Sequence, residues 1–211
     1  VEGAGQVLRI RAEPYLAGVH ASAMAAGKTW AAVCTDCHGA HAIEPSSNPA
    51  SKVHPPNIPA TCGRCHPSEK KEYEVSIHWQ AASKGIPESP VCNGCHGEHG
   101  IQPRSAATSA TAKGNVTKTC TGCHASERMM ARFGIPTDRL TSFEDTFHGL
   151  SGRLGDVRTA NCASCHEYHM ILPSTDPFSS VHTRNLARTC GHCHPNAEQR
   201  FIGGKVHVSR V

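Results

Sequence analysis

The stretch Cys34-Thr-Asp-Cys37-His38-Gly-Ala-His41-Ala-Ile43-Glu-Pro45 contains the pattern that organises the whole chain. It joins a CxxCH motif to a second histidine and then to an Ile-x-Pro segment. CxxCH motifs occur six times in the sequence, and together they use all 12 cysteines. The cysteine pairs are Cys34 and Cys37, Cys62 and Cys65, Cys92 and Cys95, Cys120 and Cys123, Cys162 and Cys165, and Cys190 and Cys193.

The spacing within each motif has a chemical reason. Two thiols three positions apart can each bond a vinyl-derived carbon on one edge of a porphyrin, and the imidazole of the next residue then reaches the iron. CxxCH is therefore the attachment signature of haem c. A redox dithiol, half of a zinc site and a disulfide framework are the alternatives, but none of them explains a histidine after every pair. The sequence predicts six covalently bound haem c groups with the proximal ligands His38, His66, His96, His124, His166 and His194.

The composition suits a fold whose core is made of haem. Leu, Ile, Val and Phe together account for 34 of the 211 residues, which is too few for an ordinary apolar core. The net charge is only +4 and no long run of one charge occurs, so the composition is not that of a disordered tail either. We expect a multihaem cytochrome c fold, mostly coil with a few short helices, in which the haems form the core.

Two kinds of surroundings are disfavoured by the sequence. Nucleic acid is not indicated as a partner, because there is no basic stripe and aromatic residues make up only 5% of the chain. No segment approaches the roughly 18 consecutive apolar residues that a bilayer requires, so we expect no transmembrane segment.

The motifs are arranged in a three-fold internal repeat. The first cysteines of paired motifs lie 28 residues apart, from Cys34 to Cys62 and at the two equivalent places. Each odd-numbered motif continues into a histidine and an Ile-x-Pro segment, and each even-numbered motif follows an Asn-x-x-x-Thr sequence. We predict three tandem dihaem modules within one continuous haem-cored domain. They are residues 1–66, residues 67–136 with the start of a 12-residue insertion, and residues 137–211 with a C-terminal tail.

Two further sets of histidines follow the repeat. One set lies 14 residues before the first cysteine of each module, and the other lies in the segment after each odd-numbered motif. They offer six candidates for six distal positions, which predicts bis-histidine ligation of every haem. A histidine of the second set follows its own motif too closely to bend back over that haem, so we expect it to reach a neighbouring one. The first set is His20, His78 and His148, and the second set is His41, His99 and His169.

His207 is a seventh candidate, because it follows Cys190 by 17 residues, close to the 16 residues between Cys62 and His78. Seven candidates for six haems imply that one end histidine is idle or ligates a haem of another molecule. We predict that His20 ligates a haem of an adjacent copy of the chain. His54 and His182 occupy equivalent positions in the repeat, but the middle module has Ala112 there, which favours contacts around a haem over ligation.

Short helices are expected to carry the upstream histidines. They are predicted over residues 14–28, 68–84 and 138–149, and a further short helix is predicted after Pro195. The rest of the chain is rich in Gly and Pro, which predicts turns and coil.

These patterns resemble the multihaem cytochromes c with doubled CxxCH modules. They are most similar to the outer-surface cytochromes that polymerise into extracellular filaments in metal-respiring bacteria and archaea. The resemblance rests on CxxCHGxHxI at residues 34–43 and 92–101, on its variant at residues 162–171, and on the Asn-x-x-x-Thr-Cys lead-ins. It implies a continuous chain of closely spaced haems, low-potential bis-histidine irons and, in some members, a distal histidine donated across a subunit interface. In the third module Glu167 and Tyr168 replace the glycine-containing spacer, while His169 keeps its position.

Electron transfer is the predicted function. We expect extracellular long-range electron transport as a polymeric filament, with other copies of the chain, redox proteins or extracellular acceptors as partners. The alternative is a soluble periplasmic electron shuttle to a terminal reductase. An enzymatic role requires an open iron, and every motif has a phased distal candidate, so we expect no enzyme. Because haem c is attached outside the cytoplasm, we expect an extracellular or cell-surface location, or otherwise a periplasmic one.

Overall fold

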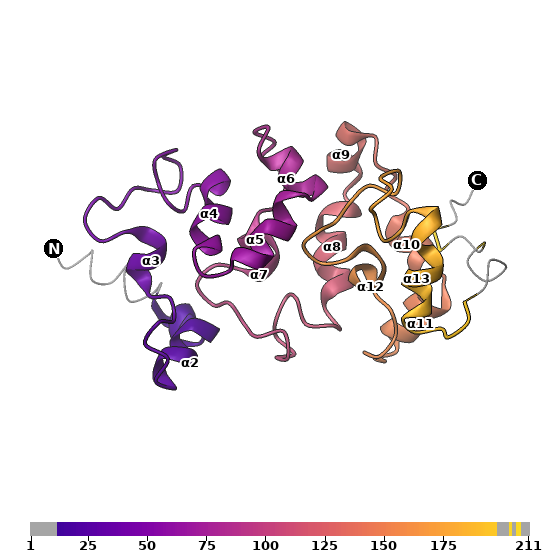
Figure 1. The fold of residues 1–211 in the computed structure, drawn as a ribbon, viewed down its shortest axis with the longest axis horizontal. Coiled ribbons are helices and arrows are strands. Elements are labelled where there is room, and N and C mark those ends of the chain that lie inside the picture. Colours follow the sequence, from indigo (N-terminus) through magenta and orange to yellow (C-terminus); the bar gives the residue numbers. More distant parts are fainter. Residues whose placement is uncertain (1–11, 198–202, 204–205, 208–211) are drawn as a thin grey trace. The chain divides into compact units, whose positions relative to one another are not determined.

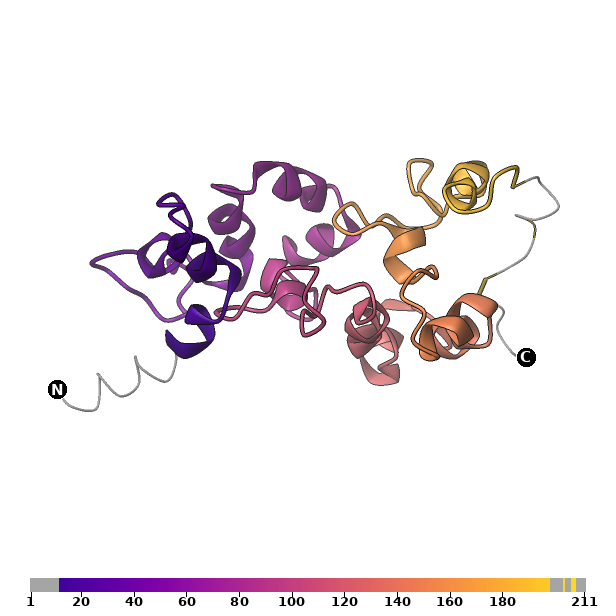
Figure 2. The ribbon, with the colours of Figure 1, turned by 90° about the horizontal axis from the view of Figure 1, so that it is seen from below.

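A computed structural model of the chain describes residues 12–197, 203 and 206–207 (Figure 1). The regular structure of these residues consists of short helices joined by long loops, as Figures 1 and 2 show. The helices are α2 (Val19–Ala25), α3 (Cys34–His38), α4 (Ile58–Gly63), α5 (Pro67–Glu74), α6 (Ile77–Ala82), α7 (Cys92–His96), α8 (Val116–His124), α9 (Glu127–Met130), α10 (Arg139–Glu144), α11 (Phe147–Arg153), α12 (Cys162–His166) and α13 (Leu186–Gly191). The 3-10 turns are η1 (Pro55–Asn57), η2 (Ala131–Phe133) and η3 (Thr183–Asn185).

The predicted long helices are each broken in two just before the upstream histidine. Helices α5 and α6 replace the single helix expected over residues 68–84, and α10 and α11 replace the one expected over residues 138–149. Residues 12–16 are likewise helical but separate from α2. The break leaves the first amide of α2 and of α6 without a partner in its own helix, and this amide donates to a carbonyl elsewhere in the chain. The helix predicted after Pro195 lies mostly outside the described residues.

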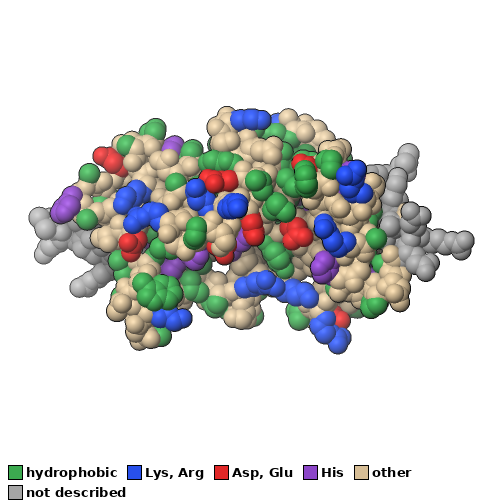
Figure 3. Space-filling model, in the orientation of Figure 1, with side chains coloured by type: hydrophobic (Ala, Val, Ile, Leu, Met, Phe, Trp, Pro, Cys, Tyr) green, Lys and Arg blue, Asp and Glu red, His purple; other side chains and the backbone are tan. Residues whose placement is uncertain are grey.

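Side chains alone make only a thin core in the described part of the chain. Apart from Gly and Pro, only ten apolar residues are buried there, and four of them are alanines, namely Ala31, Ala82, Ala112 and Ala163. Large apolar side chains remain in solvent instead, with Trp30 77% exposed and Leu154 81% exposed. On the face shown in Figure 3, Lys and Arg lie among Asp, Glu and apolar side chains. None of the helices in the described residues is long and apolar enough to cross a membrane.

Packing divides the chain into two compact units. The first comprises the described residues of Val1–Lys71 and His78–Ala112, and the second those of Glu72–Ile77 and Lys113–Val211. Each unit contains three CxxCH motifs. The units group residues by contact, whereas the three predicted modules group them by sequence repeat, so the module boundaries stay a prediction.

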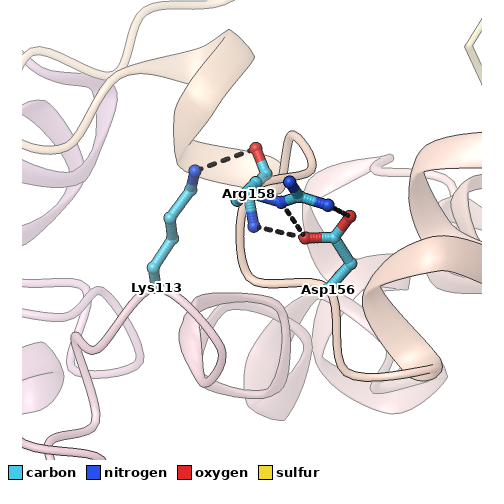
Figure 4. A network of polar contacts seen from close by, with 3 residues as sticks. All are labelled: Lys113, Asp156 and Arg158. Carbon is cyan, nitrogen blue, oxygen red and sulfur yellow. Dashed lines mark hydrogen bonds and ion pairs between the residues drawn. The ribbon is translucent and has the colours of Figure 1, made fainter.

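A small polar network holds the loop before α12 within the second unit (Figure 4). Arg158 contacts the Asp156 carboxylate through Nε at 3.0 Å and through a terminal nitrogen at 3.2 Å. The Lys113 ammonium donates to the Arg158 carbonyl at 3.0 Å, and the Asn161 side-chain amide donates to the Lys113 carbonyl at 2.9 Å. Asn161 also caps α12, because its side-chain oxygen accepts from the Ser164 amide. The network therefore fixes where the fifth motif begins.

Candidate functional site

The odd-numbered motifs form the five-residue helices α3, α7 and α12, each running from the first cysteine to the proximal histidine. The residue before each helix is extended, and the residue after it has a positive φ. That angle is 86° at Gly39, 79° at Gly97 and 68° at Glu167. The positive φ turns the chain sharply, so the segment with the second histidine leaves the direction of the helix. Glu167 adopts this conformation despite its side chain, at a cost of about 1–3 kcal/mol.

The even-numbered motifs begin on α4, α8 and α13, and the repeated Asn and Thr before them fasten the preceding loop. The Asn57 side-chain amide donates to two loop carbonyls, at 2.8 and 2.9 Å, and Asn185 donates to the two equivalent carbonyls at 2.9 and 2.8 Å. The Thr61 and Thr189 hydroxyls each donate to a further loop carbonyl at 2.7 Å. These contacts give the lead-in sequence a structural role, namely to hold the loop that joins two motifs.

The two histidines expected to contact a haem without ligating it bond to their own loops. The His54 Nδ1–H donates to the Ser46 carbonyl at 2.8 Å. His182 Nδ1 accepts from the Arg184 amide at 3.2 Å and so caps η3. Both rings therefore have a local role in the described residues.

A set of repeated serines was missed in the sequence and proves to be the most buried part of each loop. Ser51, Ser109 and Ser179 are 4%, 3% and 2% exposed. Each hydroxyl donates to the carbonyl seven residues earlier, at 2.9, 3.4 and 3.2 Å respectively. The three serines recur at the same intervals as the first cysteines of the modules, and that shared interval was the available signal.

Four pairs of histidine rings face each other across a gap that fits one iron. Because an imidazole nitrogen lies about 2 Å from a metal that it ligates, two rings on opposite sides of one iron have centroids about 6 Å apart. Each observed pair joins one predicted proximal ligand to one predicted distal candidate, so these residues fit a haem with two axial histidines. The centroid separations are 6.4 Å for His20 and His66, 5.8 Å for His38 and His99, 6.0 Å for His148 and His194, and 6.3 Å for His166 and His207.

Two arrangements that the sequence alone left open account for three of the four pairs, and the pair of His166 with His207 follows neither. An upstream histidine faces the second motif of its own module, and the separation is 46 residues both from His20 to His66 and from His148 to His194. The histidine after an odd-numbered motif faces the first motif of the preceding module, as His99 does with His38. His99 thus reaches a neighbouring haem site, in agreement with the expectation for this set.

His20 and His207 both face histidines of their own chain. His20 faces His66, and its ligation of a haem of an adjacent copy stays a prediction. His207 faces His166 of its own chain. His41, by contrast, is exposed and faces no other histidine among the described residues.

Helix α10 contributes to the placement of His207. Ser142, on α10, is 7% exposed, and its hydroxyl lies 3.1 Å from His207 Nδ1. Engaging Nδ1 leaves Nε2 available to an iron and fixes the orientation of the ring. His169 shows a related contact, since its Nδ1 lies 3.3 Å from the Glu72 carboxylate. His78, His96, His124 and His169 stay predicted ligands from their positions in the repeat.

The surroundings of these rings favour the neutral imidazole, which is the form that ligates iron. Burial is the main cause that lowers the pKa of these histidines below the ordinary value, and in four of them the facing histidine lowers the pKa further. The histidines with a lowered pKa are His20, His38, His124, His148, His166 and His207.

Cysteines of consecutive motifs also lie against one another, in two kinds of contact. Helix α4 packs on α7, where Cys62 and Cys92 share a hydrogen bond, and α8 packs on α12, where Cys120 and Cys162 do the same. In the second kind of contact, Cys37 lies near both cysteines of the second motif and Cys165 near both cysteines of the sixth.

The family described as Doubled CXXCH motif matches residues 86–129, which contain the third and fourth motifs. No curated protein and no solved structure gave a match to the chain. These findings support a multihaem c-type cytochrome. The doubled motifs of this cytochrome indicate covalently bound haem c and a role in electron transfer.

Proposed function

We propose that this cytochrome binds six haems, each with two axial histidines, and transports electrons over long distances as an extracellular filament. The facing histidine rings carry the proposal, because each of the four observed pairs is spaced for one iron. Other copies of the chain, redox proteins and extracellular acceptors would be its partners. The likeness of the CxxCHGxHxI pattern to filament-forming cytochromes supports the extracellular role.

The residues of the chain would hold the haems rather than act on a substrate. The motif cysteines bind each haem by one edge, and the paired histidines fill both axial positions. A filled iron is closed to small molecules, so we propose no enzymatic activity. When bound, each haem supplies a centre that gains and loses one electron.

Neighbouring attachment points suit transfer from one haem to the next. Cys62 lies close enough to Cys92 to raise its own pKa in the first unit, and Cys162 has its pKa lowered by Cys120 in the second. Haems attached at these neighbouring thiols would exchange electrons directly within each unit. Because the two contacts occupy equivalent positions in the repeat, the same arrangement serves both units.

Two measurements test the number of haems and the closed irons. Intact mass and the ratio of haem to protein are expected to give six haems per chain. The reduced protein is expected to bind almost no carbon monoxide. Substantial carbon monoxide binding would instead indicate an open iron and favour a reductase.

The second candidate is a soluble periplasmic shuttle, and one observation favours it. All four facing pairs, including that of His207 with His166, are formed within one chain. A chain that supplies its own ligands can work as a monomer. Electron microscopy of gently purified protein separates the two candidates, since filaments support the first and small uniform particles over a range of concentrations support the second.

A further inference from the structure

One contact between modules occurs twice in the chain in the same register. The amide of Val19 donates to the carbonyl of Ile101 at 2.8 Å, and the amide of Ile77 donates to the carbonyl of Ile171 at 2.9 Å. We use tail for residues 41–45, 99–103 and 169–173, which follow the odd-numbered motifs. In both cases the donor is the residue before an upstream histidine, and the acceptor lies two residues after the histidine of a tail. That tail belongs to the module after the one that contains the helix.

Close packing surrounds both contacts. Gly18, which precedes α2, is buried, and a Cβ placed on it would lie 3.1 Å from the His99 carbonyl oxygen. Ser76, the equivalent residue before α6, is 0% exposed. The Gln102 side-chain amide adds a bond to the Ala17 carbonyl at 2.8 Å. The tail therefore lies directly against the start of the helix.

One tail, residues 41–45, and one helix, α11, do not form this contact within the described residues. Ile43 is 61% exposed, whereas Ile101 and Ile171 are half-buried. Phe147, which begins α11 at the position of Val19 and Ile77, is 79% exposed. No acceptor for the Phe147 amide and no donor to the Ile43 carbonyl is found among the described residues.

Helix α11 also presents an apolar side that α2 and α6 lack. Phe147, Leu150 and Leu154 follow helical spacing and are 79%, 47% and 81% exposed. The equivalent residues are Ile77, Gln80 and Lys84 in one module, and Val19, Ser22 and Ala26 in the other. An exposed apolar patch of this kind is typical of an interaction surface.

We propose that α11 of one copy docks on the tail of residues 41–45 of a second copy, with the Phe147 amide bonded to the Ile43 carbonyl. The register is that of the two contacts already made within the chain. The inference deepens the proposed filament, on which it rests, by naming the surface where copies meet. Because the two halves are different patches, the contact is head-to-tail and can continue from copy to copy.

The same register predicts that His207 limits assembly. Within one chain, His99 faces His38. In the docked pair of copies, His41 of the second copy would face His166 of the first in the same way. His207 holds that place in the single chain. Docking therefore requires that His207 leave it, and His207→Ala is expected to assemble at a lower protein concentration than the unchanged chain.

Variants of the two exposed halves test the contact directly in the haem-loaded protein. Phe147→Asp and Ile43→Asp are each expected to weaken self-association at least about tenfold in analytical ultracentrifugation. Phe178→Asp is the matched control, because Phe178 is 80% exposed and takes no part in the register. Haem content and the absorption spectrum show that each variant remains folded.

Mixing the two variants gives the sharpest result. Each variant keeps one intact half, so an equimolar mixture is expected to form dimers and nothing longer. Filaments in the unchanged protein, together with variants that assemble as well as it does, would overturn this contact and leave the proposed filament standing. An unchanged protein that stays monomeric at all concentrations would overturn both, and the electron-transfer role would then be that of the shuttle.

Discussion

Two tails of nearly the same sequence have different surroundings in this cytochrome. His41-Ala-Ile43-Glu-Pro45 is exposed at its histidine and isoleucine, whereas in His99-Gly-Ile101-Gln-Pro103 the same two residues are half-buried. Both tails continue into the same turn, in which the proline carbonyl accepts an amide at 2.9 Å. The difference therefore comes from the neighbour: α2 covers the second tail, and no helix of the described residues covers the first. The repeated sequence gives both tails the same ability to contact a helix, but only the tail that has a helix beside it makes the contact.

The largest expected difference between the two tails is in haem ligation. His99→Ala is expected to open one iron, because His99 faces His38 in the structure. One haem of the six should become high-spin and bind carbon monoxide when reduced. His41→Ala is expected to leave the spectrum of the monomer unchanged, since His41 is exposed and faces no ring in the described residues. Equal spectra for both variants would contradict the assignment.

The next comparison concerns His207, which faces His166 of the third module. His207→Ala is expected to open the iron at His166, with the same spectral change as His99→Ala. Ser142→Ala should keep a low-spin iron but shift its reduction potential, because the hydroxyl at Nδ1 orients the ring. Potentiometry with electron paramagnetic resonance measures both effects. An unchanged potential in Ser142→Ala, with Ser142→Thr as the conservative control, would remove the positioning role.

A third comparison tests what the two kinds of tail share. Ser51 follows the exposed tail and Ser179 follows a covered one, yet both hydroxyls donate to a carbonyl seven residues earlier. Replacing either serine by alanine is expected to lower the free energy of unfolding by about 1–3 kcal/mol, since a buried acceptor loses its donor. Chemical denaturation of the haem-loaded protein measures the loss, with the exposed Ser68→Ala as control. A loss confined to Ser179→Ala would show that the loop depends on the docked tail.

Substitutions in the turn before each tail, at Gly97 and Glu167, are expected to change the free energy of unfolding by a smaller amount, downward at Gly97 and upward at Glu167. Glu167→Gly is expected to raise the free energy of unfolding by about 1 kcal/mol, because glycine adopts the positive φ at this position without strain. Gly97→Ala should lower it by a similar amount for the same reason. Open space surrounds Gly97, so crowding does not contribute to the loss. A destabilised Glu167→Gly variant would mean that the Glu167 side chain makes a contact worth more than the strain.

The smallest expected effect concerns the ion pair found only in the third module among the described residues. Arg158 lowers the pKa of Asp156 below its ordinary value of 3.8 through hydrogen bonds, and the equivalent residues in the middle module, Ile86 and Glu88, cannot form an ion pair with each other. A carboxylate with a lowered pKa stabilises the fold above pH 3.8 and loses that contribution as the pH falls through the lowered value. Asp156→Asn should therefore cost little stability at neutral pH and remove part of the acid sensitivity. Thermal unfolding measured from neutral pH to about pH 3 checks this, and an unchanged acid profile would contradict it.

The extent of helix shows where sequence patterns stop being informative. The sequence correctly indicated helical segments around His78 and His148, but it could not show the breaks at Ser76 and Thr146. At Thr146 the side chain caps α11 by accepting from the Gly149 amide, whereas the break at Ser76 is stabilised by the Ile171 carbonyl, which accepts the first amide of α6. Local propensity contains no information about that acceptor.

By itself the sequence determined where haem is attached and which residues repeat, because the spacing of Cys, Cys and His within a motif is a local covalent requirement. It also identified every histidine that the four facing pairs contain. Only the tertiary structure decided which histidines meet, since His20 and His66 lie 46 residues apart and His38 and His99 lie 61 apart. Pairing at such separations depends on how loops fold over one another. For the same reason only the structure showed that His207 faces His166 and that His41 faces no histidine of the described residues.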